Sequence, residues 1–357
     1  MTVCILYGGK SGEHEVSQRS AASVVRNLDA KRHAVVLIGI DKQGRWHLQE
    51  GPRFTTIEGQ GEVLGIGPSR GAVSVVPSDG IHVDGRRLPI DCVFPVLHGT
   101  FGEDGTIQGL LETAGIPYVG AGVLGSSASM DKEAAKRLWR DAGLPIVEFE
   151  VVRRGESEET WRAAAGRIGF PVFVKPVSAG SSLGAARVDA PEGLRAAVED
   201  ALRYDTRALV EKCVDAREIE CAVIGNAEPR AFAPGEIVTS REHGFYSYDA
   251  KYTDPDGASL ETRADLAPAV RELVMRTAES AYAVIRCEGM ARVDFFIDRK
   301  SGKVSLNEIN TLPGFTSISM FPRMCEASGL PYPRLLETLI DLAMARDAER
   351  RTVRFEK

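Results

Sequence analysis

The sequence lacks the features of a membrane protein or of a disulfide-rich secreted protein. No hydrophobic run in its 357 residues approaches the roughly 20 apolar residues of a transmembrane helix. The first ten residues, MTVCILYGGK, have no basic segment before the apolar run, so we expect no signal peptide. The six cysteines are scattered, without a C-x-x-C pair. This pattern favours reduced thiols, and we expect a cytoplasmic protein.

Other absences exclude two kinds of site. The six histidines show no H-E-x-x-H arrangement, which excludes that zinc-protease motif. The formal net charge of -6 gives no electrostatic signature for nucleic acid, and we expect neither nucleic acid nor membrane among the partners. There is no internal repeat and no low-complexity segment. A chain of this length is too long for one compact core, which favours two or three domains.

The first third of the chain predicts an open α/β sheet. Apolar runs at 2–7, 33–41 and 92–99 are typical of buried strands, and a helix is expected from Val16. Sheets of this kind bind ligands beyond the carboxyl ends of their strands. The stretch 51–90 is rich in Gly and Pro and predicts short β-turn structure.

The remainder predicts two α+β lobes. The segment 130–145 is expected to be a helix with five residues on one face: Ala134, Ala135, Leu138, Trp139 and Ala142. Short strands are expected at 170–176, 184–189, 208–212 and 218–225, and further helices at 266–285 and 333–346. The predicted fold is therefore an α/β N-terminal open-sheet domain followed by two α+β lobes, with domains at 1–122, 123–213 and 214–357.

A hairpin at 292–310, RVDFFIDRKSGKVSLNEIN, carries polar residues where aliphatic ones would fill a core. A turn at 299–303 gives three facing pairs: Asp298 with Val304, Asp294 with Glu308, and Arg292 with Asn310. The last two pairs then project from one face. Oxygen ligands without sulfur or imidazole suit a hard cation such as Mg²⁺. The alternative is a solvated face of an antiparallel sheet.

Three further segments suggest a nucleotide site. In VKPVSAGSSLGAARV (174–188), Lys175 ends a strand and a Gly/Ser loop follows, whose N–H groups can cover phosphates. Glu211 and Glu218 can accept hydrogen bonds from an adenine amino group and from ribose hydroxyls. After the hairpin, the turn at Pro313-Gly314 can present a backbone N–H to an oxyanion. The alternatives are ordinary turns and solvated surface charge.

Eight segments in series resemble the ATP-grasp enzymes and, more narrowly, the D-alanine–D-alanine ligase family. They are GGKSGEHEVS (8–17), HGTFGEDGTIQG (98–109), MDKEAAKRLW (130–139), FVKPVSAGSSLG (173–184), EIECAVIG (218–225), FYSYDAKY (245–252), MARVDFFI (290–297) and NEINTLPGFTSISM (307–320). Two details depart from the common pattern: the loop before Ser181 lacks a longer polar side chain at Ser178 or Ala179, and position 213 is Cys where an apolar or aromatic residue is frequent.

The resemblance implies a full set of site residues. ATP would be bound by Lys132, Lys175, Ser181, Ser182, Glu211, Lys212, Val214, Glu218 and Lys251. Two Mg²⁺ or Mn²⁺ ions would be held by Asp294, Glu308 and Asn310. The residues implied in catalysis are Glu15, Ser181, Tyr252, Arg292, Gly314 and Ser319. The first D-alanine would meet Glu15 and His98, and the carboxylate of the second would meet Lys251 and Ser319.

The implied activity is the ATP-dependent joining of two D-alanines through an acyl phosphate, for peptidoglycan precursor synthesis. The substrates would be D-alanine and ATP, and we expect a homodimer. A hydrogen-bond link of Glu15, Ser181 and Tyr252 would close the site, and Tyr252 favours a dipeptide product over an ester with D-lactate. The rivals are another ATP-grasp carboxylate–amine ligase and a binding module that senses a nucleotide or an amino acid without turnover.

Overall fold

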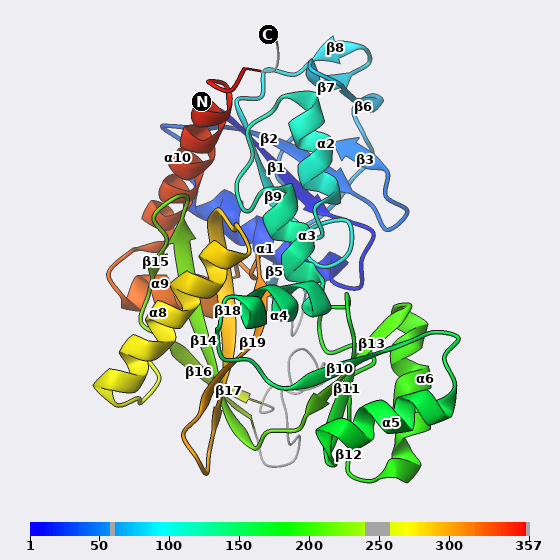
Figure 1. Cartoon of the computed structure of the whole chain (residues 1–357). Helices are drawn as coiled ribbons and strands as arrows, with labels where there is room; N and C mark the ends of the chain where they lie inside the picture. The colour runs from blue at the N-terminus through cyan, green and yellow to red at the C-terminus, as the bar shows by residue number, and fades with distance from the viewer. Residues whose placement is uncertain (58–60, 240–257, 317, 355–357) are drawn as a thin grey trace.

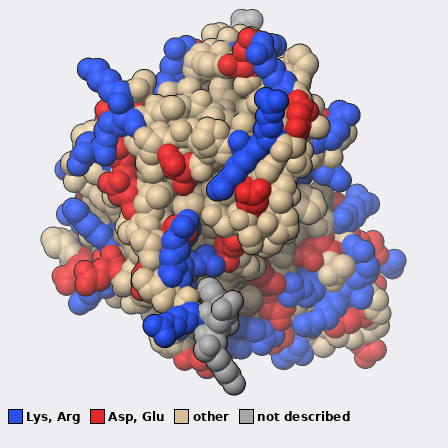
Figure 2. Space-filling model, turned by 90° about the horizontal axis from the view of Figure 1, so that it is seen from above, with Lys and Arg blue, Asp and Glu red and all other residues tan. Residues whose placement is uncertain are grey.

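Figure 1 shows the computed structural model of the chain, which describes residues 1–57, 61–239, 258–316 and 318–354. Within these ranges no helix combines the length and the apolar character needed to cross a lipid bilayer. On the face seen in Figure 2, basic and acidic side chains are interspersed.

The N-terminal sheet has the order β3-β2-β1-β9, in which β1 runs parallel to both β2 and β9. Its strands are β1 (Thr2–Gly8), β2 (Ala34–Ile40), β3 (Trp46–Leu48) and β9 (Cys92–Val96). Its helices are α1 (His14–Asn27), α2 (Thr106–Ala114) and α3 (Val123–Met130). Strands β1 and β9 are largely apolar because nearly all of their residues are buried. This is the predicted open α/β sheet.

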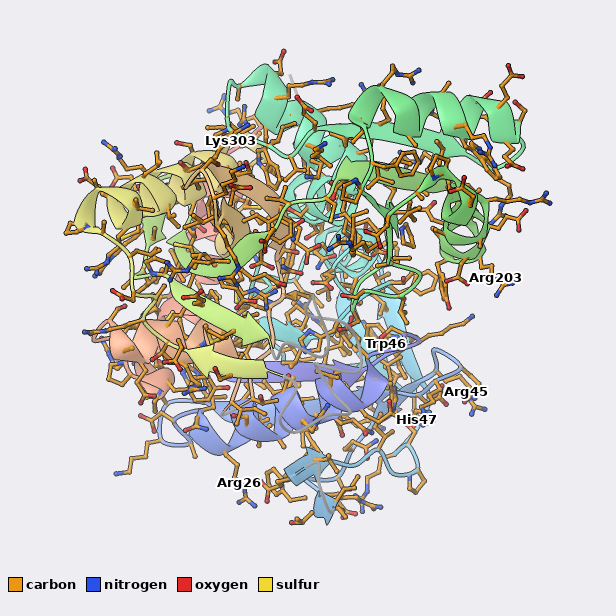
Figure 3. The ribbon with its side chains drawn as sticks, turned by 90° about the horizontal axis from the view of Figure 1, so that it is seen from below. Arg26, Arg45, Trp46, His47, Arg203 and Lys303 are labelled. Carbon is orange, nitrogen blue, oxygen red and sulfur yellow. The ribbon has the colours of Figure 1, made fainter. Side chains whose placement is uncertain are left out.

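The stretch 51–90 forms two small antiparallel sheets, in agreement with the predicted turn-rich structure. Their strands are β4 (Phe54–Ile57), β5 (Gly61–Leu64), β6 (Val73–Val76), β7 (Gly80–Val83) and β8 (Arg86–Arg87). Arg26 of α1, labelled in Figure 3, lies 3.7 Å from the centre of the Phe54 ring and pairs with Glu62 at 2.8 Å. This contact fixes the first small sheet to α1.

The second sheet is antiparallel, with the order β10-β13-β11-β12. Its strands are β10 (Phe149–Arg153), β11 (Val172–Pro176), β12 (Ala186–Val188) and β13 (Arg207–Lys212). The helices beside it are α5 (Glu158–Ile168), η1 (Pro191–Gly193) and α6 (Leu194–Tyr204). Val172 and Val174 pack into the helix-covered core, so Phe173 and Lys175 point to the opposite face. That opposite face lines a cavity.

The third sheet is also antiparallel, with the order β17-β16-β14-β18-β19 and β15 paired to β14. Its strands are β14 (Ala216–Gly225), β15 (Arg230–Ala231), β16 (Gly235–Thr239), β17 (Ala258–Glu261), β18 (Gly289–Asp298) and β19 (Val304–Asn310). The helices around it are α4 (Lys132–Asp141), α8 (Pro268–Val284), α9 (Met320–Ala327) and α10 (Tyr332–Arg350). Both lobes have the predicted α+β character, while the domain boundaries stay a prediction.

Two hydrophobic cores hold the third sheet in place. On one face, Val223 and Val293 pack with Trp139 of α4 and with Tyr282 of α8. On the other face, a continuous core joins the third sheet to α10 and to the N-terminal sheet, and it includes Ile5, Phe94, Ala222, Met290, Phe321 and Leu335. The end of the chain therefore packs beside its beginning, as Figure 1 shows for α10 and the N-terminal strands.

Helix α4 differs from its prediction in one respect. The predicted inward face included Leu138 and Ala142, but both are exposed. The inward face consists of Lys132, Ala135, Lys136 and Trp139, which follow helical spacing and include two buried lysines. Hydrophobic periodicity alone places lysines on the outer face of a helix. Here Lys136 pairs with the buried Glu211, and Lys132 donates to the Ala179 carbonyl.

Candidate active site

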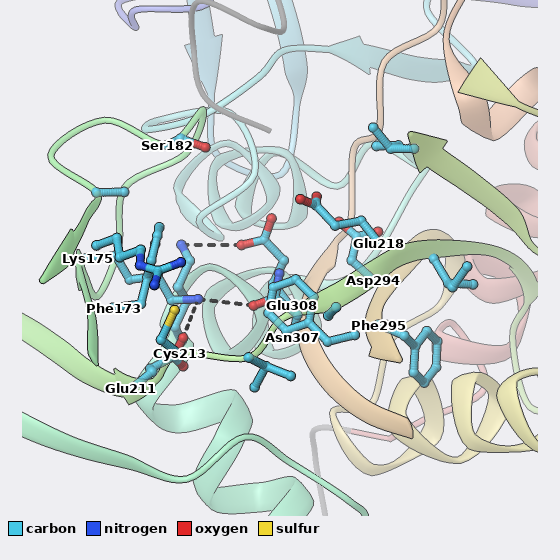
Figure 4. Close-up of a pocket in the computed structure, with 18 of the residues that line it drawn as sticks. Phe173, Lys175, Ser182, Glu211, Cys213, Glu218, Asp294, Phe295, Asn307 and Glu308 are labelled. Carbon is cyan, nitrogen blue, oxygen red and sulfur yellow. Dashed lines mark hydrogen bonds and ion pairs between the residues drawn. The ribbon is translucent and has the colours of Figure 1, made fainter. Parts of the chain in front are cut away.

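A cavity of about 250 Å³ lies where the second and third sheets face each other (Figure 4). Its walls come from β11, β13, β14, β18 and β19, and from the loop between β11 and β12. The predicted residues that line it are Lys132, Lys175, Ser181, Ser182, Glu211, Lys212, Val214, Glu218, Arg292, Asp294 and Glu308. Residues as far apart in sequence as Lys132 and Glu308 thus meet in one place.

Glu211 forms the floor of the cavity together with two lysines. It lies on β13 between Phe149 of β10 and Phe173 of β11, and it is buried. Lys175 Nζ lies 2.7 Å from its Oε2 atom, and Lys136 Nζ lies 2.9 Å from its Oε1 atom. Burial raises the pKa of Glu211, but the two ammonium groups outweigh it and the pKa falls below its usual value. An ionised acceptor therefore faces the cavity.

Lys132 connects the loop of the second sheet to the third sheet. It begins α4 just after the N-cap Asp131, whose side chain accepts from the Ala134 N–H at 2.9 Å. Its Nζ donates to the Ala179 carbonyl at 2.7 Å and lies 3.8 Å from Glu308 Oε2. Burial lowers the pKa of Lys132, and the attraction of Glu308 opposes that shift. The ammonium is thus placed at the boundary of the two walls.

Three carboxylates stand in a row across β14, β18 and β19. Glu220 is the partner of Asp294 across one strand pair, and Asp294 is the partner of Glu308 across the next. Arg292 donates to both oxygens of Asp294, at 2.8 and 2.7 Å, and its Nε lies 3.2 Å from Glu220. Burial lowers the pKa of Arg292, but Asp294 and Glu220 raise it well above its usual value. Asn310 Nδ2 donates to Asp294 Oδ2 at 3.0 Å.

The pairing of the hairpin confirms the predicted facing of Asp294 with Glu308 and of Arg292 with Asn310. Near the turn the prediction is wrong, because Val304 faces Ile297 and not Asp298. Asn307 is the extra residue of a bulge that changes the register between these two regions. Its Oδ1 accepts from Lys175 at 3.1 Å, so the bulge directs a further polar group into the cavity.

The donor set of Asp294, Glu308 and Asn310 fits a hard cation. All three contribute oxygen, from paired strands and on one face. Across the part of the chain that the structure describes, no three His, Cys, Asp or Glu side chains form a complete cage. Mg²⁺ is commonly bound by one or two carboxylates together with substrate phosphates, which matches this partial set.

The loop between β11 and β12 contains two serines in the left-handed region, Ser181 at φ 52° and Ser182 at φ 56°. Ser181 Oγ donates to Glu13 Oε1 at 2.5 Å. The predicted link of Ser181 to Glu15 is therefore wrong: Glu15 pairs with Lys42 at 2.5 Å. Glu13 precedes the first turn of α1 and faces the loop, whereas Glu15, two residues on, lies on another side of the helix.

Glu13 is also close to Glu103. The Glu103 side chain accepts from the Gly99 N–H at 2.8 Å, beyond the end of β9. Burial and then repulsion from Glu13 raise the pKa of Glu103 to about 8. Two carboxylates thus lie together at the carboxyl ends of β1 and β9, where one of them keeps its proton at neutral pH.

His98 is buried at the end of β9 and belongs to a network with the turn after the hairpin. Its Nδ1 donates to the Leu312 carbonyl at 2.9 Å, which leaves Nε2 to accept from Ser20 Oγ at 3.1 Å. Ser20 Oγ in turn accepts from the Phe315 N–H at 3.3 Å. Burial lowers the pKa of His98, in agreement with a neutral ring. His98 therefore positions the turn at 311–315.

Gly314 and Ser319 lie in that turn and at the start of α9. Ser319 Oγ accepts from the Thr316 N–H at 3.1 Å and lies so close to Gly314 that an added Cβ would be 2.8 Å away. Position 314 therefore has no room for a side chain unless Ser319 moves. Phe315 anchors the turn against Phe94, with ring centres 5.8 Å apart. The buried Phe315 therefore holds the backbone of the adjacent Gly314 in place.

The edge of the cavity near β13 and β14 carries the other residues predicted to bind adenine and ribose. Cys213, Val214 and Glu218 line it, and Cys213 is half-buried with a pKa raised by burial. Lys212 lies at the rim and donates to the carbonyls of residues 168 and 169, each at 3.4 Å. The side chain of Lys212 is thus exposed, and its backbone borders the cavity.

Lys251 and Tyr252 lie outside the described residues, so their predicted places in the closed site stay predictions. Sequence reasoning missed five residues that the structure brings to the site: Glu13, Glu103, Lys136, Glu220 and Asn307. The spacing of Lys132 and Lys136 on one helix face could have indicated Lys136. The strand alternation of EIECAVIG could have placed Glu218 and Glu220 on one face. The bulge at Asn307 has no comparable signal.

Comparison with known proteins agrees with this geometry. Residues 2–121 match the family described as D-ala D-ala ligase N-terminus, and residues 138–341 match D-ala D-ala ligase C-terminus. The D-alanine--D-alanine ligase of Treponema denticola is 47% identical, covering 97% of this chain and 96% of that protein. The solved D-alanine-D-alanine ligase of Coxiella burnetii is 37% identical, with a TM-score of 0.83, and covers 99% of this chain and 96% of that chain.

A further solved structure, the VanG D-Ala:D-Ser ligase of Enterococcus faecalis, is 33% identical with a TM-score of 0.84, covering 96% of this chain and 99% of that chain. The neighbours and the described sheets confirm the ATP-grasp fold that the eight segments implied. The matches span nearly all of the sequence, and the chain belongs to the D-alanine–D-alanine ligase family.

Proposed function

We propose that this protein joins two D-alanine molecules into D-alanyl-D-alanine at the expense of ATP, for peptidoglycan precursor synthesis. The observation that carries the proposal is the meeting of lysines and Glu211 from the second sheet with acids and Arg292 from the third sheet in one cavity. Relatives that bear the name D-alanine--D-alanine ligase support the choice of substrates.

ATP occupies the cavity with its base at Glu211 and its phosphates between the two walls. Glu211 accepts from the exocyclic amino group of adenine, and the backbone at Lys212 and Val214 borders the base. Glu218 accepts from the ribose hydroxyls. Lys132 and Lys175 meet the phosphates, covered by the loop that carries Ser181 and Ser182.

Asp294, Glu308 and Asn310 would hold two Mg²⁺ or Mn²⁺ ions. When bound, they would supply positive charge that neutralises the phosphate oxygens. Arg292 donates to Asp294, so its guanidinium is a fixed positive charge beside the reacting groups.

The first D-alanine lies at the carboxyl ends of β1 and β9, where Glu13 takes the ammonium-binding role that sequence reasoning gave to Glu15. Its carboxylate oxygen attacks the γ-phosphorus, ADP leaves, and an acyl phosphate forms. The neutral amine of the second D-alanine then attacks the carbonyl carbon. Arg292 and the Gly314 N–H stabilise the oxyanion, and phosphate leaves with the former carboxylate oxygen while the nitrogen releases a proton to give the amide. Ser319 and Lys251 bind the second carboxylate, and Tyr252 helps to close the site against water.

The test is ADP release by the purified protein with ATP, Mg²⁺ and D-alanine, with mass spectrometry of the product. We expect ADP release that depends on D-alanine, and one dipeptide per ADP. D-Serine and D-lactate offered beside D-alanine should give less mixed product than dipeptide. Equal ADP release without D-alanine, or mainly ester with D-lactate at neutral pH, would contradict the proposal.

We also propose that the protein acts as a homodimer in the cytoplasm, without nucleic acid or membrane as partner. The formal net charge of -6 supports the last point. Light scattering after size-exclusion chromatography tests the oligomeric state, and a mass of one chain of 38.6 kDa would contradict the dimer.

A further inference from the structure

Lys136 is a buried lysine that does not line the cavity. It lies on α4, one turn after Lys132, and its side chain is 0% exposed. A buried ammonium is costly unless a counter-charge and a fixed geometry compensate for the lost hydration. A lysine in this position therefore needs a specific partner.

That partner is Glu211. Lys136 Nζ lies 2.9 Å from Glu211 Oε1 and 6.0 Å from the centre of the Phe149 ring. Phe149 is itself the strand partner of Glu211, so the ammonium sits against the same short part of the second sheet. Burial lowers the pKa of Lys136, and Glu211 opposes that shift.

The two lysines on Glu211 differ in what else they can bind. Lys175 lines the cavity and also donates to Asn307 at 3.1 Å, so its ammonium is within reach of a ligand. Lys136 stands behind Glu211, away from the cavity lining. When Lys175 turns to the nucleotide phosphates, Lys136 stays as the cation that keeps Glu211 ionised and oriented.

We propose that Lys136 is a positioning residue: it holds Glu211 as the acceptor for the exocyclic amino group of adenine and thereby sets the preference for ATP. This inference rests on the ATP site proposed above. Without Lys136, a protonated Glu211 would donate where the amino group needs an acceptor. The preference for a base with that amino group would then decrease.

The experiment measures KM for ATP and for purine-riboside triphosphate, which lacks the amino group, in wild-type protein and in Lys136→Met. The readout is ADP or purine-riboside diphosphate release with saturating D-alanine. We expect KM for ATP to rise about tenfold or more in the variant, since hydrogen bonds to charged groups contribute about 1.5 to 3 kcal/mol. The KM ratio of the analogue to ATP should fall toward one.

Two further variants separate positioning from a general loss of structure. Arg137→Met removes a cation of the same helix whose partner is Glu133, and it should leave the analogue-to-ATP ratio unchanged. In a Glu211→Gln background, Lys136→Met should cause no further change in that ratio, because both residues act through one contact. If Lys136→Met does not fold, Lys136→Gln provides the same comparison.

An unchanged ratio in folded Lys136→Met or Lys136→Gln would overturn the inference while leaving the proposed function intact. A further fall in the analogue-to-ATP KM ratio, caused by Lys136→Met in the Glu211→Gln background, would also overturn it. Wild-type protein that releases no ADP with D-alanine would contradict the proposed function itself. The two failures are therefore distinguishable.

Discussion

The two walls of the cavity carry opposite charge clusters of the same size. On the second-sheet side, Lys136 and Lys175 pair with Glu211, and Lys132 adds a third ammonium at the boundary of the two walls, 3.8 Å from Glu308. On the third-sheet side, three carboxylates surround one guanidinium, and the members are Glu220, Asp294, Glu308 and Arg292. One wall thus has excess positive charge and the other excess negative charge. Phosphate suits the first wall and divalent cations suit the second, so a metal–nucleotide complex is complementary to both.

The walls also differ in how their charges are held. The lysines come from a helix and a strand end, and long flexible side chains bring them together. The carboxylates are fixed by strand register, because neighbouring strands place Glu220, Asp294 and Glu308 side by side. The acidic wall should therefore tolerate substitution less than the basic wall.

The largest effect is expected from Glu308→Gln, which removes a charge from the acidic wall at nearly constant volume. ADP release with D-alanine should fall by roughly a hundredfold to a thousandfold, because a metal ion contributes several kcal/mol to transition-state stabilisation. Steady-state kinetics at saturating ATP and Mg²⁺ measures it. Glu272→Gln, at an exposed site on α8, is the matched control. Retained activity in Glu308→Gln would remove this residue from the metal site.

The next largest effect, on KM for D-alanine, is expected to distinguish the two glutamates at the start of α1. Glu13→Gln should raise KM for D-alanine about tenfold to a hundredfold, as expected for a hydrogen bond to a charged group. Glu15→Gln should change it less than about twofold, because the exposed Glu15–Lys42 pair contributes little. The opposite order would return the substrate contact to Glu15.

A smaller effect is expected from Glu103, whose carboxyl group lies near that of Glu13. Unfolded Glu103 ionises near 4.5, whereas in the folded protein burial and Glu13 raise its pKa to about 8. The folded state therefore binds more protons between these values, and stability falls as pH rises through this window. Glu103→Gln cannot ionise, so it lacks this pH-dependent loss of stability, and it keeps an acceptor for the Gly99 N–H. The Tm of the variant minus that of the wild type should therefore increase by about a few degrees from pH 5 to pH 8. A constant difference in Tm across that range would contradict the shift.

The smallest effect is expected at the rim. Lys212→Ala removes an exposed side chain whose hydrogen bonds to carbonyls are long, at 3.4 Å. KM for ATP should change less than about threefold, because exposed substitutions usually alter free energies by at most about 0.5 kcal/mol. A large increase would show that the side chain, and not the backbone alone, contacts the nucleotide.

Much of the fold follows from patterns that the sequence carries directly. The apolar runs of β1, β2 and β9 predict an open α/β sheet, and the charged hairpin predicts the facing of Asp294 with Glu308. What escapes prediction depends on tertiary placement. Glu13 and Glu15 are two residues apart, and only the start of α1 decides which of them faces Ser181. Lys136 resembles a surface lysine until the buried Glu211 beneath it is known.

The most direct test is a crystal structure of the protein with Mg²⁺ and a non-hydrolysable ATP analogue. We expect the adenine amino group at Glu211, and the phosphates between Lys132 and Lys175 on one side and metal-bound Asp294 and Glu308 on the other. A nucleotide bound elsewhere, with these side chains still paired only to each other, would contradict it.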